Sequence, residues 1–406
     1  GEGEGSRKRT VRAEDFWHKS SFLVRIQNMG ILIEKGRFSI CAVYEDGEVS
    51  SLKKYIGLED MGNVNCSRVL DVIRRCGPVS RKQISDITGL SWGGMTKIVN
   101  KLFDHGYIVE EKDENGSGAG RTPGLIRVNG NRHVVAGFDL NREGFEARVM
   151  NLCGDVLKTY GENIVYEGKE DLLRAILGFI GGVLREYEEK NVLSAGIAMQ
   201  GVLDVDRGIS VRFPQCPGWE HIPVREILEQ KFGIDVFVEH DPNCILYSLM
   251  KGGAGGNMLL FRLDRSIGMA ASVHGEILRG NGLLEVAHCI VAPGGKPCRC
   301  GKKGCMEAYL APCIKDGKPD RQALRELLDP LAVFMHNMVR MFHSDTVIVT
   351  GKLVRYRDNF EKELLACFYR YCPPNEVEVR LVEEAGLAVG GAALIAAQGA
   401  VDRLQI

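Results

Sequence analysis

The stretch that decides the fold is "CRCGKKGC", residues 298–305. It contains three cysteines, Cys298, Cys300 and Cys305, within a short loop-like run. The chain has 13 cysteines, and its polar first residues, "GEGEGSRKRT", contain no apolar signal segment. A disulfide framework is therefore not expected, and three explanations remain: a metal site, a redox site, or core cysteines that lie together by chance.

A fourth metal ligand lies upstream in "EVAHCIVAPGGKPCRCGKKGCMEAY", where His288 precedes the cysteines. Three cysteines and one histidine form a closed structural Zn²⁺ set, and the glycines between them permit the tight turns that wrap a loop around an ion. No coordination position is left for a substrate. We therefore predict a structural zinc held by His288, Cys298, Cys300 and Cys305, without Cys289, which is adjacent to His288 and points elsewhere.

The two alternatives for this cluster are weaker. A redox role is disfavoured because a C-x-C pair in a loop lacks the C-x-x-C arrangement at the start of a helix that lowers a thiol pKa. Core cysteines without a metal are the remaining explanation, and Cys66, Cys76, Cys153 and Cys244 fit that description elsewhere in the chain.

Length and charge restrict the class of protein. A chain of 406 residues predicts two or three domains. Hydrophobic residues make up 45% and charged residues 26%, and the net charge is −1, so any nucleic-acid surface has to be local. No apolar run is long enough to predict a membrane span, and we expect a cytoplasmic protein.

Three segments follow from composition and periodicity. Residues 1–60 are left unassigned, as a tail or a short hairpin with Asp46 and Gly47 at its turn. Residues 64–130 are predicted to form three helices and a β-hairpin, the plan of a winged helix-turn-helix DNA-binding domain. Residues 131–406 are predicted to form an α/β effector and dimerisation domain in two lobes.

The helix-turn-helix prediction depends on helix start and stop signals. Ser80 and Ser91 are expected N-caps, and Gly89 and Gly106 are expected to end the second and third helices. Between residues 65 and 108, seven basic and three acidic residues give a local net charge of +4. Such a charge suits phosphate contacts, although a helical dimerisation module of the same shape is the alternative.

The third helix is predicted to enter the major groove of DNA with its N-terminal residues foremost. Gly93 and Gly94 inside this helix either allow close approach to DNA or weaken the helix. The hairpin tip is expected to reach a minor groove or a phosphate. The predicted DNA-binding residues are Arg81, Ser91, Trp92, Gly93, Thr96, Lys97, Asn100, Lys101 and Arg121.

The rest of the chain repeats one pattern. Three strand-like runs, a helix around 169–188 and an apolar strand, "LSAGIAMQG", recur later as further strand-like runs, a helix around 321–343 and the strand "DTVIVTG". Two α/β halves of related layout predict an actin-like, two-lobed fold of the sugar-kinase type.

The cysteine run resembles the signature of the ROK family (repressors, open reading frames and sugar kinases), which is E-x-G-H followed by C-x-C-G-x-x-G-C-x-E. The resemblance covers about residues 64–400, including the winged helix-turn-helix that ROK repressors carry and ROK kinases lack. It implies an actin-like two-lobed fold, a zinc ion beside the sugar pocket, and homodimers or homotetramers.

The resemblance also implies a sugar pocket. ROK sugar kinases have an Asn-Asp pair at the end of a strand, and its aspartate is the catalytic base. Asp241 matches that base, but His240 replaces the asparagine. The implied sugar-binding set, which either recognises a different sugar or has lost its ligand, is Asp241, Glu285, His288, Glu307, Gln215 and His240.

The phosphate-binding loops depart from the family pattern. The D-x-G-G-T loop is replaced by residues 139–143, which lack both glycines and the threonine, and Glu143 would repel phosphate. The G-T-G-I-G loop keeps only its last two positions in residues 264–268, and a later Gly-Gly pair is reduced to Gly351-Lys352. The run "GLAVGGAAL" is kept, but close helix packing explains it. We therefore expect no catalytic activity.

The sequence accordingly predicts a DNA-binding transcriptional regulator, most simply a repressor, that binds operator DNA and is controlled by a sugar or sugar-phosphate effector. The alternatives are a sugar kinase with an attached DNA-binding domain and a scaffold whose ROK part only dimerises.

Overall fold

The computed structural model describes most of the chain, which divides into two compact units, Gly1–Arg68 with Leu404–Ile406, and Val69–Arg403. Each unit is described by itself. The described residues are 21–26, 29–34, 37–43, 49–50, 58–111, 124–141, 144–250, 256–279, 286–315 and 317–406, with side chains from 62 onward except 357–359.

The first unit contains an antiparallel sheet of four strands in the order β1-β2-β3-β4. The segment between β3 and β4 that contains Asp46 and Gly47 lies outside the described residues. The strands are β1 (Ser21–Ile26), β2 (Met29–Glu34), β3 (Arg37–Val43) and β4 (Val49–Ser50).

The second unit begins within α1 (Leu58–Cys76), which is followed by α2 (Arg81–Thr88) and α3 (Trp92–Asp104). The predicted caps are confirmed: Ser80 forms a capping box with Gln83, and the Ser91 hydroxyl accepts a hydrogen bond from the Gly94 N–H.

The turn between α2 and α3 depends on one glycine. Gly89 ends α2 with φ 69°, a left-handed conformation that a residue with a side chain rarely adopts. The short turn lets Ile84, Met95 and Leu102 pack in one core, where all three side chains are fully buried.

The hairpin after α3 consists of β5 (Ile108–Glu111) and β6 (Leu125–Val128), which pair antiparallel. Val79 adds a bridge to Ile126 on β6, so the chain before α2 joins the same small sheet. The segment between β5 and β6, which includes Arg121, lies outside the described residues.

The first half of the body is a five-stranded sheet in the order β14-β10-β7-β8-β9. Its three first strands form an antiparallel meander, and β10 and β14 then add in parallel to β7. Its elements are β7 (His133–Leu140), β8 (Phe145–Asn151), β9 (Val156–Glu162), α4 (Lys169–Arg185), β10 (Asn191–Met199), α5 (Val224–Phe232) and β14 (Asp235–His240).

A small sheet interrupts this half between β10 and α5. It is antiparallel in the order β11-β12-β13. Its strands are β11 (Val202–Asp204), β12 (Ile209–Arg212) and β13 (Glu220–Ile222).

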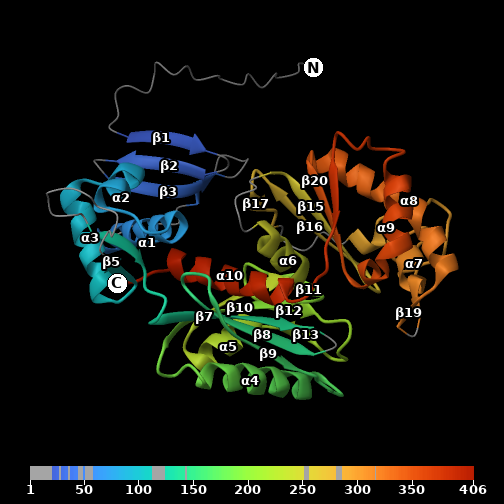
Figure 1. The fold of residues 1–406 in the computed structure, drawn as a ribbon, viewed down its shortest axis with the longest axis horizontal. Helices are drawn as coiled ribbons and strands as arrows, with labels where there is room; N and C mark the ends of the chain where they lie inside the picture. Colours follow the sequence, from blue (N-terminus) through green and yellow to red (C-terminus); the bar gives the residue numbers. More distant parts are fainter. Residues whose placement is uncertain are drawn as a thin grey trace, which may run out of the picture. The chain divides into compact units, whose positions relative to one another are not determined.

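The second half repeats the same topology in the sheet order β17-β16-β15-β20-β21 (Figure 1). Again three strands form an antiparallel meander, and two parallel strands extend it beyond the first. The predicted α/β class with two related halves is therefore confirmed. The main elements are α6 (Asp241–Met250), β15 (Met258–Leu263), β16 (Ile267–Val273), β17 (Glu276–Ile277), α8 (Arg321–Phe342), β20 (Thr346–Thr350), α9 (Arg357–Phe368) and β21 (Glu378–Leu381).

Short elements complete this half. A two-stranded ribbon, β18 with β19, precedes α8. The remaining elements are η2 (Val286–His288), α7 (Met306–Leu310), η3 (Ala311–Cys313), β18 (Ile314–Lys315), β19 (Lys318–Pro319) and η4 (Lys352–Tyr356).

The last helix, α10 (Leu387–Asp402), packs tightly in the centre of the body. A Cβ on Gly391 would overlap the carbonyl of Cys244 in α6, and a Cβ on Gly137 or Gly196 would overlap the α10 backbone. These glycines let α10 approach α6, β7 and β10 closely. The packing explanation for "GLAVGGAAL" is thereby confirmed.

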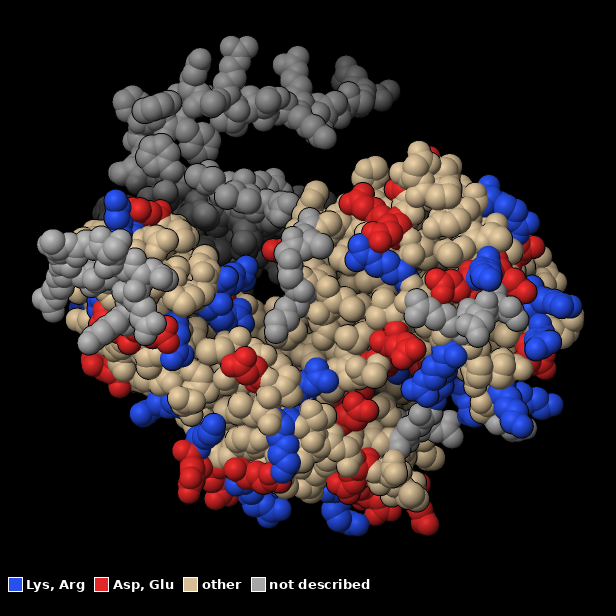
Figure 2. Space-filling view, viewed as in Figure 1, with Lys and Arg blue, Asp and Glu red and all other residues tan. Residues whose placement is uncertain are grey.

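Surface charge on the body is mixed. Lys and Arg alternate with Asp and Glu over the face seen in Figure 2, as a net charge of −1 leads one to expect. Among the helices of the described residues, none is both long enough and apolar enough to cross a membrane.

Candidate functional site

The four predicted zinc ligands converge. His288 ends η2, Cys305 directly precedes α7, and the ligand atoms of His288, Cys298, Cys300 and Cys305 all lie within 4.8 Å of one another. The Sγ atoms of Cys300 and Cys305 are 3.7 Å apart, and Cys298 Sγ lies 3.6 Å from His288 Nδ1. Zn–S bonds of about 2.3 Å place two sulfurs at tetrahedral corners about 3.8 Å apart, so this donor set fits zinc.

The backbone around these ligands is held by short-range hydrogen bonds. The Cys298 N–H donates to the Lys302 carbonyl at 2.8 Å, and the Gly304 carbonyl accepts from Val291. Gly304 has φ 82°, and a Cβ there would overlap the carbonyl of Ala292. Glycine is therefore required at this turn, and the cysteines on both sides can face one point.

Glu307 lies beside the ligands but already has a cationic partner. Its buried carboxylate accepts two hydrogen bonds from the Arg299 guanidinium, at 3.1 and 2.6 Å. Oε2 of Glu307 is also 3.6 Å from His288 Nδ1. A sugar hydroxyl that bound Glu307 would have to compete with Arg299.

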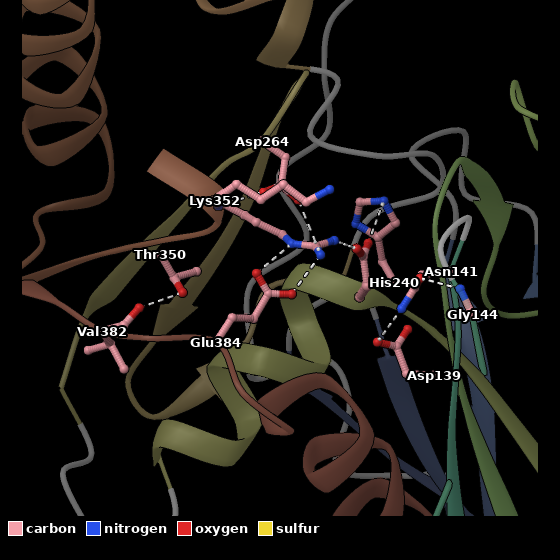
Figure 3. Close-up of polar contacts among 11 residues, drawn as sticks. Asp139, Asn141, Gly144, His240, Asp264, Thr350, Lys352, Val382 and Glu384 are labelled. Carbon is pink, nitrogen blue, oxygen red and sulfur yellow. Dashed lines mark hydrogen bonds and ion pairs between the residues drawn. The ribbon is translucent and has the colours of Figure 1, made fainter. Parts of the chain in front are cut away.

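A second polar cluster lies around Arg262 of β15, whose side chain is 13% exposed. Figure 3 labels two acidic residues of this cluster, Asp264 and Glu384. The Arg262 guanidinium forms an ion pair with Asp241, the first residue of α6. The same guanidinium lies 3.2 Å from Asp264 and 2.6 Å from Glu384. Arg262, Asp241, Asp264 and Glu384 are called the Arg262 cluster below.

The charges in the Arg262 cluster stabilise one another. Burial disfavours the charge on Arg262, but Asp241, Asp264 and Glu384 together raise its pKa above the ordinary value. Burial raises the pKa of Glu384, and Arg262 opposes that shift. The guanidinium is therefore the counter-ion of the three carboxylates that surround it.

The first expected phosphate loop, between β7 and β8, is closed on itself. Asn141 Nδ2 donates to Asp139 at 3.2 Å, and the Gly144 N–H donates to Asn141 Oδ1 at 3.2 Å. Asn141 thus links Asp139 to Gly144 across the described part of the loop. Arg142 and Glu143 lie outside the described residues.

Asp139 is buried at the end of β7, and its Oδ1 has no hydrogen-bond partner among the described residues. Burial, followed by the charge of Asp241, raises its pKa to about 7. Unlike Asp241, this carboxyl has no direct ion pair within that part of the chain.

The second expected phosphate loop is a tight hairpin between β15 and β16. The Asp264 carboxylate accepts the backbone N–H of Lys352 at 2.7 Å, at the start of η4. A Cβ on Gly351 would crowd the backbone of Leu263. Gly351 therefore serves packing, and the chain's own carboxylate occupies a backbone donor of the kind that binds phosphate.

Residues 135–313 match the sequence model of the ROK family. The chain carries a ROK domain.

The similarity to transcriptional regulators extends over most of the chain. This chain is 23% identical to the xylose repressor of Caldicellulosiruptor bescii, over 82% of its own length and 95% of that protein. A solved ROK family transcriptional regulator, described as a homologue of the E. coli MLC protein, superposes with a TM-score of 0.72 at 21% identity, over 84% of this chain and 97% of that one.

The ROK domain also resembles enzymes. The glucokinase of Thermotoga maritima is 32% identical over 44% of this chain and 57% of that protein. These comparisons confirm a domain of the predicted ROK family at residues 135–313 and a sugar-kinase-like α/β fold.

The six predicted sugar-binding residues are not all joined in the structure. Among the described residues, hydrogen bonds and ion pairs connect His288 with Glu307, and separately place His240 Nε2 3.8 Å from Asp241. Gln215 is exposed on the turn between β12 and β13. Glu285 lies outside the described residues.

Most of the predicted DNA-binding residues lie on the surface. Ser91, Gly93, Lys97 and Asn100 are exposed, and Trp92 is 59% exposed. Thr96, Lys101 and Arg81 are half-buried. The Arg81 guanidinium pairs with Glu110 of β5 at 2.6 Å, so a phosphate would compete with that carboxylate. Arg121 lies outside the described residues.

Sequence reasoning missed Arg262 and Glu384. One signal was present, because Arg262 is a single charge inside the apolar strand "MLLFRL". A buried arginine needs partners. The sequence does not name those partners, since Asp241 and Glu384 are 21 and 122 residues away.

Proposed function

We propose that the chain is a DNA-binding transcriptional regulator of the ROK family, a repressor in the simplest case, whose ROK domain binds an effector and does not phosphorylate it. The observation that carries the proposal is the length of the similarity. The two regulators align with 82% and 84% of this chain. Residues 131–406 alone make up a smaller share of the chain, so both alignments extend into the segment before residue 131.

The N-terminal part of the second unit supports the DNA-binding role. The elements α1, α2 and α3 and the pair β5-β6 follow in the order of a winged helix-turn-helix domain. The N-terminal residues of α3, which face the major groove in such domains, are exposed. We assign residues 64–130 to this domain.

The Arg262 cluster supports the absence of kinase activity. A base has to reach the proton of the sugar hydroxyl, but the Asp241 carboxylate is already engaged in an ion pair with the Arg262 guanidinium. Asp264 adds negative charge at the backbone N–H of Lys352, where a nucleotide phosphate would be repelled. Asp241 is therefore proposed to bind a ligand and not to catalyse.

The effector is proposed to be a sugar or sugar derivative. Adjacent sugar hydroxyls are good donors to carboxylates, and Asp241 and Glu307 are buried carboxylates of the ROK domain. Each is paired with an arginine, so a ligand binds only if it replaces those hydrogen bonds. Such replacement would give the ligand different affinities for two states of the protein, which control by an effector requires.

A titration with DNA tests the regulator proposal. Duplexes are selected from a random pool with the full chain, and binding is measured at several salt concentrations. Sequence-selective binding that weakens with salt is expected. Binding that shows no sequence preference excludes the proposal. Light scattering in the same buffers tests the homodimer or homotetramer that we expect of a cytoplasmic operator-binding protein.

A sugar kinase with an attached DNA-binding domain is the second candidate, favoured by the retained Asp241 and the resemblance to a glucokinase. A coupled assay with ATP and a panel of hexoses separates the two candidates. Turnover that disappears in Asp241→Asn would establish the kinase. A scaffold role would be indicated by intact DNA binding together with no heat of binding for any sugar or sugar phosphate.

A further inference from the structure

We propose that α3 recognises thymine in the DNA major groove, through contacts of the Trp92 indole and the Thr96 methyl group with the thymine C5-methyl. This inference rests on the proposed DNA-binding function and specifies the bases that the domain selects. It follows from the apolar groups that α3 exposes and from the polar side chains that are already hydrogen-bonded within the helix.

The polar side chains at the start of α3 are already hydrogen-bonded within the helix. The Ser91 hydroxyl accepts the Gly94 N–H at 3.3 Å, and the Thr96 hydroxyl donates to the Trp92 carbonyl at 2.8 Å. Gly93 has no side chain, and a Cβ there would meet no atom within 4 Å. The first turn and a half of α3 therefore presents a mainly apolar surface to a partner.

Trp92 is the largest group on this surface. It is 59% exposed, whereas Met95, Ile98 and Leu102 of the same helix are buried in the domain core. An indole in water is unfavourable unless a partner covers it, and its single N–H is the only polar group that it can offer. The missing side chain at Gly93 leaves room for a base edge next to the ring.

The only apolar group on the base edges of the major groove is the C5-methyl of thymine. Threonine and other apolar side chains contact this methyl in protein–DNA complexes. Since the Thr96 hydroxyl is engaged inside the helix, its methyl is the part left for such a contact. An apolar surface in a polar groove thus selects thymine.

The groups around this surface are complementary to DNA. Lys97 is exposed beside Thr96, and Lys82 is exposed on α2, so both can contact phosphates. Asn100 is exposed one turn after Thr96 and has no hydrogen-bond partner among the described residues. Its amide can pair with the N6 and N7 edge of adenine, the partner of thymine.

The test replaces thymine by deoxyuridine, which removes the methyl and keeps every hydrogen-bonding group. Duplexes are first selected from a random pool with the full chain, and each thymine of the selected site is then exchanged. At one or two positions per half-site, the dissociation constant should rise about fourfold for each methyl lost.

Two variants assign the effect to side chains. Trp92→Ala and Thr96→Ser should each weaken binding to the thymine duplex and reduce the difference between thymine and uracil. Thr96→Ser keeps the hydroxyl that bonds within the helix and removes only the methyl. Lys97→Ala is the matched control: it should weaken both duplexes equally and lower the salt slope by about one.

The outcomes separate the two proposals. Failure to select any duplex overturns the regulator proposal and this inference with it. Selected duplexes that bind equally well with thymine and uracil at every position overturn the inference alone. A Trp92→Ala variant with unchanged DNA affinity and an altered association state also overturns it, because Trp92 would then belong to a protein interface.

Discussion

The loop that carries the predicted zinc ligands His288, Cys298, Cys300 and Cys305, called the zinc loop, is one polar centre of residues 131–406, and the Arg262 cluster is another. They differ in where their counter-charge comes from. In the zinc loop, four donor atoms face one another within 4.8 Å, and the nearby arginine pairs with Glu307. In the Arg262 cluster, the guanidinium itself stands among the carboxylates.

A retained motif therefore has to be judged by whether the rest of the chain already satisfies its charges and hydrogen bonds. Among the described residues, the donor set of the zinc loop contains no cationic side chain, and its chemistry fits an external ion such as zinc. The Arg262 cluster is satisfied by the chain itself, so a retained Asp241 does not imply a retained reaction.

The largest loss of stability is expected when a predicted zinc ligand is removed. Cys300→Ser should lower zinc content well below one ion per chain and reduce the free energy of unfolding by more than about 4 kcal/mol, because metal binding and folding of the loop are coupled. Elemental analysis and thermal unfolding measure both. Cys289→Ser, next to His288 but outside the donor set, is the control that should retain the ion. Full zinc content in Cys300→Ser would show that Cys300 is not a ligand.

The second largest loss of stability is expected when the guanidinium of the Arg262 cluster is removed. Arg262→Met leaves Asp241, Asp264 and Glu384 without their counter-ion and should cost about 3–5 kcal/mol of folding free energy. Adding Asp241→Asn should restore part of it, which denaturant unfolding can measure. Arg340→Met removes an exposed pair with Glu376 and should cost less than about 1 kcal/mol. Equal losses in the two arginine variants would contradict the assigned role of Arg262.

Asp139 is a buried carboxyl beside the Arg262 cluster, and its pKa is raised to about 7. The folded state binds its proton more tightly than the unfolded state, so its stabilising contribution is complete below about pH 4 and is lost as the pH rises to 7. Asp139→Asn should therefore match the wild type at pH 4 and exceed its stability at pH 7 by about 1–4 kcal/mol. Parallel stability curves between pH 4 and 8 would refute this.

The smallest expected effect concerns nucleotide. ATP with Mg²⁺ should shift the melting temperature by less than about 1 °C, because a ligand that does not bind cannot stabilise the fold. Chelation of zinc in the same assay should lower it clearly. A saturable upward shift with ATP would mean that the Arg262 cluster rearranges to admit a nucleotide, and the kinase alternative would return.

Local signals predicted much of the fold. The caps at Ser80 and Ser91 and the turn at Gly89 were predictable, because capping depends on residues within one helical turn. The fifth strand of the second sheet, β21, was not predicted. Its sequence "EVRL" is short and half polar, and it is a strand because β20 pairs with it in parallel.

The zinc ligands were easier to predict than the sugar-binding residues, because sequence signals report on residues that are close together in the chain. The zinc ligands lie within one loop, so their spacing alone defined the set. The proposed sugar residues lie on separate elements, and Glu307 and Asp241 have arginine partners that their positions did not reveal.

By itself, the sequence determined the α/β class, the helix caps and the zinc donor set, because each depends on residues close together in the chain. Only the tertiary structure decided the state of Asp241. Burial of Arg262 demanded a carboxylate partner, but the carboxylates that surround it come from α6, the β15–β16 turn and the segment before α10. Distant segments fold onto one guanidinium, so the residue that matches the catalytic aspartate of ROK sugar kinases forms an ion pair.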